Sequence, residues 1–318
     1  MRKNKFMTII TMMILVSLLA VGCTSPGDDV GETKNPDDPI VLGSFVDTEG
    51  GILGNMLLLA LEKEGYQITD KVQFATPDVH RNALLQGELD MGIDYTGNGQ
   101  YYSDNADEEA WRDAGIGYDT IKAYDMENNG LVWLQPAKAN NTEMLAVKRE
   151  FADANNLKDL NDFAKYVNDG GQVKFITSQL FAEKKFGLLG MEEAYGFKLN
   201  PDQLILLPHG NTAETISALA NGTDDVNVAL VYGTDGALVD LDLVVLDDPE
   251  SIPPVFEPSA IVRAEVLEKY PEIEGIIESV FATLTLENLQ TMNKNVIVDG
   301  MSPKDVAKDH MTNEGLLD

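Results

Sequence analysis

The chain has 318 residues, of which 44% are hydrophobic and 24% charged, and its formal net charge at pH 7 is −30. This composition is typical of a globular protein long enough for two domains, and the acidic excess argues against nucleic-acid binding, which needs basic surfaces. One cysteine and three dispersed histidines exclude an internal disulfide and any obvious zinc, haem or iron–sulfur site, so we expect no metal and no cofactor.

The N-terminal residues have the pattern of a processing signal. A basic start precedes an apolar segment over 7–19 that is short for a membrane span. Small residues then lead into the only cysteine, Cys23, as in lipoprotein signals, and an uncleaved anchor is the alternative. We therefore predict a signal peptide over 1–22, a lipidated Cys23 that anchors an extracytoplasmic protein to the cell membrane, and a flexible tether over 23–38.

The first half of the folded chain has a β-α-β-α-β pattern. Strands are expected over 40–42, 71–74 and 89–95, with helices beginning at Thr48 and at Pro77. This order implies parallel strands joined by right-handed crossovers. The third strand brings Tyr95 to its carboxyl end, where α/β folds place their ligands. Asp90 and Asp94 alternate with apolar residues there, and we expect them on an exposed edge.

The second half repeats this pattern. Strands are expected over 173–176, 204–207 and 226–231, with helices capped by Ser178 and by Asn211 or Thr212. The last of these strands carries Tyr232 into a Gly-Thr-Asp-Gly turn, as the earlier one carries Tyr95 into Thr-Gly-Asn-Gly. Two α/β modules with equivalent edges predict two lobes that face a cleft, although any two α/β units share some features. Helices from 266 onward are expected to pack back on the first lobe.

Six segments of the chain resemble a known family, in order and at similar spacing. They are LGSFVDTEGGILGNM, LLQGELDMGIDYTGNG, ANNTEMLAV, EEAYGFKL, VYGTDGALVDLDLVVL and PSAIVR. They resemble the substrate-binding lipoproteins of ABC importers for osmoprotectants such as glycine betaine, carnitine and choline. The resemblance implies an α/β, two-lobed periplasmic-binding-protein-like fold of type II, with the ligand cleft between the lobes. Lobe 1 would comprise 39–138 and 242–318, and lobe 2 would comprise 139–241.

The resemblance also implies an aromatic cage for a quaternary ammonium ligand. A trimethylammonium group has no hydrogen to donate, so the negative faces of aromatic rings hold it. Carried over onto this chain, the cage positions are Tyr95, Tyr232 and Phe256. Glu143 stands where the family has another aromatic residue. Each of these residues also has a structural interpretation: packing at the sheet edge for the tyrosines, core filling for Phe256 and a solvated loop acid for Glu143.

Three further positions follow from the same resemblance. Lys184, with Lys185 as the alternative, replaces an arginine that binds the ligand carboxylate, and an exposed helix lysine is the structural interpretation. Phe45 replaces a lysine and adds a ring, while Thr48 is expected first as a helix cap and second as a ligand contact. Because Glu143 adds a negative charge and a lysine binds carboxylate less specifically than arginine does, we expect a slight preference for choline over betaine.

These features favour a binding protein that delivers its ligand to the membrane subunit of an ABC permease. A ligand sensor, or a binding protein for a different small polar solute, is the alternative. An enzyme is disfavoured because the sequence contains no P-loop, G-x-S-x-G or H-E-x-x-H motif. Closure is expected about hinges near 136–141 and 233–241.

Overall fold

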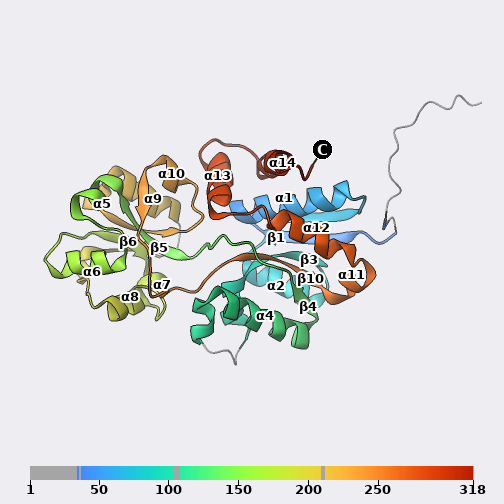
Figure 1. Ribbon diagram of the computed structural model, residues 1–318, viewed down its shortest axis with the longest axis horizontal. Helices are drawn as coiled ribbons and strands as arrows, with labels where there is room; N and C mark the ends of the chain where they lie inside the picture. Colours follow the sequence, from blue (N-terminus) through green and yellow to red (C-terminus); the bar gives the residue numbers. More distant parts are fainter. Residues whose placement is uncertain (1–33, 36, 104–107, 209–211, 318) are drawn as a thin grey trace, which may run out of the picture. The chain divides into compact units, whose positions relative to one another are not determined.

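The computed structural model describes residues 34–317 except 36, 104–107 and 209–211. The predicted signal peptide, the lipidated Cys23 and Asn211 lie outside the described residues. Residues 34–318 form one compact unit. This unit contains two five-stranded sheets, each flanked by helices (Figure 1).

The first sheet has the strand order β2-β1-β3-β10-β4. Its strands are β1 (Ile40–Phe45), β2 (Ile68–Ala75), β3 (Met91–Tyr95), β4 (Leu131–Trp133) and β10 (Pro258–Arg263). β1 pairs in parallel with both β2 and β3, which confirms the β-α-β-α-β prediction. β10 enters between β3 and β4 and is antiparallel to β3. The sequence analysis did not predict this strand.

The second sheet has the order β7-β6-β8-β5-β9 and the same topology. Its strands are β5 (Glu143–Lys148), β6 (Phe175–Ser178), β7 (Leu204–Leu207), β8 (Val228–Tyr232) and β9 (Leu243–Val245). β6 is parallel to β7 and β8, and β5 lies antiparallel beside β8 as β10 lies beside β3. The predicted repeat is therefore confirmed, with β3 and β8 as its equivalent central strands.

The chain passes between the two sheets at 134–142 and again at 246–257. The first passage includes the expected hinge at 136–141. The expected second hinge at 233–241 is wrong, because the chain there remains in the second sheet and continues into β9, where Val147 pairs with Val244. The predicted lobe boundary at 242 likewise separates β9 from the sheet to which it belongs. The rest of the lobe assignment stays a prediction.

Helices cover both faces of the first sheet. They are α1 (Thr48–Lys63), α2 (Pro77–Gln86), α4 (Ala114–Asn129), α11 (Ala264–Lys269), α12 (Glu272–Phe281), α13 (Leu286–Ile297) and α14 (Pro303–Asn313). α1 packs against α12, α13 and α14, which confirms that the C-terminal helices return to this half (Figure 1). Strand alternation sends Met91 and Ile93 into the core shared with α1, and Trp133 into a second core with α2 and α4.

The second sheet is covered in the same way. Its helices are α5 (Arg149–Asn155), α6 (Leu160–Asn168), α7 (Gln179–Glu183), α8 (Leu188–Tyr195), α9 (Thr212–Asn221) and α10 (Ala237–Asp240). Leu145 and Val147 of β5 pack with residues of α5, α6 and α8, whereas Ala146 packs with residues of α9 and α10. Helices thus cover both faces of the second sheet as well.

Local signals account for most of the helix ends. Gly87 ends α2 with a φ of 72°, a left-handed conformation that glycine adopts without a steric cost. Ser178 caps α7 by accepting a hydrogen bond from Phe181 N at 3.1 Å, as predicted. The cap of α1 is Asp47, whose Oδ1 accepts from Gly50 N at 2.7 Å. Thr48 is therefore the first helical residue, and its predicted role as the cap is wrong.

Candidate functional site

Asp94 organises the turn that follows β3. Its Oδ1 accepts hydrogen bonds from Tyr95 N at 2.7 Å and Asn98 Nδ2 at 2.6 Å, and its Oδ2 accepts from Tyr102 Oη at 2.8 Å. Asp94 is fully buried, so its expected place on an exposed edge is wrong. The alternation of polar and apolar residues predicted the wrong exposure for Asp94 because helices cover both faces of this central strand. Asp94 instead holds the short helices η1 (Thr96–Asn98) and α3 (Gly99–Tyr102) against the sheet.

The burial of Asp94 has a consequence for stability. Burial raises the pKa of Asp94 to about 6, against 3.8 ordinarily, so the native state binds this proton more tightly than the unfolded chain does. The stabilisation from proton binding is complete below pH 4 and is lost as the pH rises to 6. We expect the free energy of unfolding to fall about 1–3 kcal/mol more across this range in the wild type than in Asp94→Asn. Urea denaturation at a series of pH values measures the difference, and parallel profiles would contradict the assignment.

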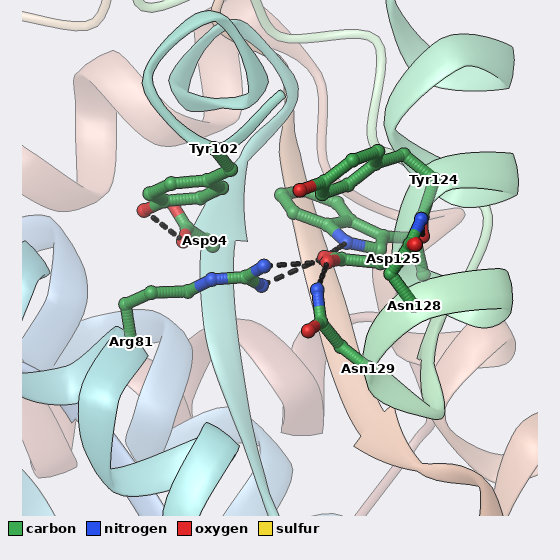
Figure 2. A network of polar contacts seen from close by, with 8 residues as sticks. Arg81, Asp94, Tyr102, Tyr124, Asp125, Asn128 and Asn129 are labelled. Atoms are coloured by element: carbon green, nitrogen blue, oxygen red, sulfur yellow. Dashed lines mark hydrogen bonds and ion pairs between the residues drawn. The ribbon is translucent and has the colours of Figure 1, made fainter. Parts of the chain in front are cut away.

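A buried ion pair lies beneath the same turn (Figure 2). Arg81 Nη1 donates to Asp125 Oδ2 at 2.7 Å, and Trp133 Nε1 donates to the same oxygen at 2.6 Å. The guanidinium carbon of Arg81 lies 4.2 Å from the centroid of the Tyr102 ring. Trp133 is fully buried. The network therefore supports Tyr102 from below while Asp94 binds its hydroxyl group.

Tyr95 lies at the end of β3 with its ring largely buried. It is 7% exposed, and its ring centroid lies 6.1 Å from that of Phe45, which is 2% exposed. Phe256 packs nearby, since a β-carbon placed on Gly97 would lie 2.8 Å from its Cδ1 atom. The structure therefore brings three predicted site residues, Tyr95, Phe45 and Phe256, to the same turn.

The hydroxyl group of Tyr95 donates to Glu49 Oε1 at 2.6 Å. Glu49, in the first turn of α1 next to the half-buried Thr48, is itself buried, and burial raises its pKa. Asn293 Nδ2 in α13 donates to Glu49 Oε2 at 2.6 Å and to the carbonyl oxygen of Thr234 at 2.9 Å. Glu49 and Asn293 thus connect the turn after Tyr95 with the turn after Tyr232.

The second group of predicted residues gathers around the end of β8. Glu143 pairs directly with Tyr232 across β5 and β8, and its carboxylate forms an ion pair with Lys184. Burial raises the pKa of Tyr232, and the carboxylates of Glu143 and Asp235 raise it further. Lys185, the alternative to Lys184, pairs instead with Glu108 at 2.6 Å.

Glu143 also borders free space. A cavity of about 100 Å³ lies beside β5, and Asn140, Thr142, Glu143 and Val255 are among the residues that line it. The interpretation of Glu143 as a solvated loop acid is therefore wrong, because the residue is 9% exposed and lies in a strand.

Tyr101 is a residue of this neighbourhood that the sequence analysis did not select. It belongs to α3 and is 68% exposed, yet partial desolvation raises its pKa and the charge of Glu143 raises it further, while Tyr101 makes a small contribution to the raised pKa of Tyr232. Tyr101, from the helix that follows β3 and η1, is therefore within electrostatic range of Glu143 and Tyr232 in the second sheet. Its position six residues after Tyr95 was the available signal, but nothing local indicates which way the turn folds.

Gly236 allows α13 to approach the Tyr232 turn. A β-carbon on Gly236 would lie 2.1 Å from the backbone nitrogen of Lys294. We expect Gly236→Ala to lower the free energy of unfolding by about 1–3 kcal/mol through overpacking. Gly275→Ala in α12 is the matched control, since a β-carbon there meets nothing within 4 Å and alanine should stabilise the helix by up to about 1 kcal/mol. Equal thermal unfolding of the two variants would contradict this packing.

Residues 38–313 match the family described as the substrate-binding domain of the ABC-type glycine betaine transport system. The glycine betaine-binding protein YehZ of Escherichia coli (strain K12) is 42% identical over 277 residues, which are 87% of this chain and 91% of that protein. The glycine-betaine-binding protein of Pseudomonas aeruginosa is 30% identical over 283 residues, 87% of this chain and 88% of that protein.

Solved structures agree in fold. Apo YehZ from Escherichia coli superposes with a TM-score of 0.79 at 42% identity, over 88% of this chain and 99% of that chain. A structure described as a glycine betaine/carnitine/choline ABC transporter has a TM-score of 0.76 at 21% identity, over 88% and 100% of the two chains. The predicted α/β fold of a periplasmic binding protein is confirmed.

Within the described part of the chain, no helix has both the length and the apolar character that a membrane span requires. The matched family consists of transport proteins and not of enzymes, which confirms that prediction. Substrate-binding proteins of ABC importers act outside the cytoplasm. Because the family match covers residues 38–313 and the relatives match over nearly the same length, this chain belongs to the family of substrate-binding domains of ABC-type glycine betaine transport systems.

Proposed function

We propose that this protein captures a quaternary ammonium osmoprotectant and delivers it to an ABC permease, while a lipid on Cys23 anchors it outside the cell membrane. The observation that carries the proposal is the pairing of Tyr232, at the end of β8, with Glu143, at the start of β5, together with Tyr101 of α3, which is near enough for the charge of Glu143 to act on it. The negative faces of two phenol rings are complementary to a cation that donates no hydrogen bond, and the carboxylate beside them is shared with Lys184. Tyr95, Phe45 and Phe256 provide a second set of rings at the neighbouring turn.

Glycine betaine is the first candidate ligand, and choline is the second. The relatives from Escherichia coli and Pseudomonas aeruginosa are named for glycine betaine. Choline would be favoured by an uncompensated negative charge at Glu143, but Lys184 pairs with that carboxylate. A zwitterion with separate ammonium and carboxylate groups matches the Glu143–Lys184 pair better than a simple cation does.

A thermal-shift screen tests the proposal. The protein without its lipid would be screened against glycine betaine, choline, carnitine, proline betaine and free amino acids. A ligand that binds only the native state raises the unfolding temperature, so we expect shifts with one or more of the quaternary ammonium compounds and none with the amino acids. Shifts with amino acids alone, or with no compound, would overturn the proposal.

A further inference from the structure

Glu49 is a buried carboxylate that has no cationic partner within the part of the chain that the structure describes. It is 5% exposed, and the partners that the structure gives it among the described residues are the neutral side chains of Tyr95, Asn141, Thr234 and Asn293. A buried charge is costly to maintain unless hydrogen bonds or an opposite charge stabilise it. Glu143 is different, since Lys184 balances its charge.

The groups around Glu49 are also rich in unused acceptors. The side-chain oxygens of Asn141 and Asn293 are buried and have no hydrogen-bond partner within the described residues. Both side chains turn their NH₂ groups toward Glu49, Asn293 at 2.6 Å and Asn141 at 3.4 Å. The cluster formed by Glu49, Asn141 and Asn293 therefore has acceptor oxygens without donors, and a bound cation would complement them and stabilise the ionised form of Glu49.

We propose that Glu49 sets the negative charge of the ligand site and acts through Tyr95 as a positioning residue; this inference rests on the function proposed above. The hydroxyl group of Tyr95 donates to Glu49 at 2.6 Å. A phenol that donates to a carboxylate has a more electron-rich ring, and such a ring attracts a cation more strongly. The carboxylate also attracts the cation directly through a medium of low dielectric constant.

Glu49 has a second effect through Asn293. The same Asn293 amide nitrogen contacts both Glu49 and the carbonyl oxygen of Thr234. Glu49 therefore helps to hold the turn after Tyr232 near the turn after Tyr95. This effect on geometry depends on the shape and hydrogen bonding of the Glu49 side chain. The electrostatic attraction of a cation depends instead on the charge of Glu49.

A pair of substitutions separates the two effects. Glu49→Gln keeps the shape of the side chain and removes its charge, while Glu49→Asp keeps the charge and shortens the side chain. We expect Glu49→Gln to lower the affinity for glycine betaine or choline roughly tenfold, and Glu49→Asp to lower it less. Calorimetric titration of the purified protein measures both affinities. An equal or greater loss in Glu49→Asp would overturn the inference.

Ligands without the positive charge provide an independent readout. The carbon isosteres 3,3-dimethylbutanoate and 3,3-dimethylbutan-1-ol replace the ammonium nitrogen of glycine betaine and choline. In competition titrations, Glu49→Gln should reduce the affinity ratio of cation to isostere, and an unchanged ratio would overturn the inference. Glu192→Gln is the control, because Glu192 is a buried carboxylate of α8, bonded to Leu199 N at 2.9 Å and to Lys198.

Two further results separate a failure of the proposed function from a failure of the inference about Glu49. If the wild type binds no quaternary ammonium compound, the proposed function fails before Glu49 is tested. If Glu49→Gln does not fold, Tyr95→Phe provides the test, since it keeps the ring and removes the hydroxyl group that contacts Glu49. We expect Tyr95→Phe to weaken cation binding several-fold. Unchanged cation affinity in Tyr95→Phe would overturn the part of the inference that assigns Glu49 a role through Tyr95.

Discussion

Asp125→Asn is expected to lower the free energy of unfolding by about 3–5 kcal/mol. The substitution preserves the shape of the side chain but leaves the guanidinium group of Arg81 without its partner in a buried site. Asp125 is fully buried, and Arg81 is 6% exposed. The asparagine can no longer accept from Arg81 and Trp133 as a charged group does, so those bonds weaken as well.

Urea denaturation measures this effect against a matched control. Asp169→Asn removes an acidic partner from the exposed Lys165–Asp169 pair, where Asp169 is 66% exposed. Exposed pairs of this kind contribute little to stability, so the control should unfold like the wild type. Equal midpoints for the two variants would show that the buried pair has no special role.

The loss of Asp125 should also disturb the proposed ligand site. Arg81 lies against the ring of Tyr102, whose hydroxyl group donates a hydrogen bond to Asp94. Asp94 also accepts a hydrogen bond from the backbone amide of Tyr95. The turn from Tyr95 to Tyr102 therefore rests on a continuous set of buried contacts (Figure 2). Asp125→Asn therefore disturbs this turn indirectly, through the buried contacts beneath it.

The second large effect is expected at Tyr232. Tyr232→Ala removes a ring that lies opposite Glu143, and we expect a loss of about 1–2 kcal/mol in the binding free energy of glycine betaine or choline. Because about 1.4 kcal/mol corresponds to a factor of ten in affinity, that loss means a roughly five- to thirtyfold weaker affinity. The same change at Tyr95 is less informative, because Tyr95 also belongs to the hydrophobic core.

Calorimetric titration measures the affinity, and Tyr232→Phe is the control. Phenylalanine retains the face of the ring and removes only the hydroxyl group, so most of the affinity should remain. If alanine and phenylalanine at position 232 bind the ligand equally well, Tyr232 is not part of a cage. Unchanged unfolding temperatures without ligand would show that both variants are folded.

The turns at Tyr95 and Tyr232 are held by the same kind of hydrogen bond. In each, an aspartate accepts the amide hydrogen of the tyrosine that ends the central strand: Asp94 for Tyr95 and Asp235 for Tyr232, both at 2.7 Å. Burial raises the pKa of each aspartate to about 6. The repeat that the sequence showed as matching Tyr-Thr-Gly and Tyr-Gly-Thr segments thus extends to the hydrogen bonds that hold the two tyrosines.

The sequence by itself determined the parallel strands, the turns that follow Tyr95 and Tyr232, and the helix end at Gly87. Each of these depends on neighbouring residues: the period of the apolar positions, a capping group or a glycine with positive φ. The family resemblance added the expected cage positions, which stay predictions. It also selected Glu143 and Lys184, although the sequence could not show that these two pair with each other.

Only the tertiary structure decided which residues meet at the site. β10 enters the first sheet from a distant part of the chain, β9 joins the second sheet, and Asn293 reaches Glu49 from α13. Such contacts depend on strand pairing and helix packing between remote segments, which no local pattern encodes. For the same reason Asp94 is buried although polar and apolar residues alternate in its strand. Helices packed on both faces of the sheet determine which residues are exposed to solvent.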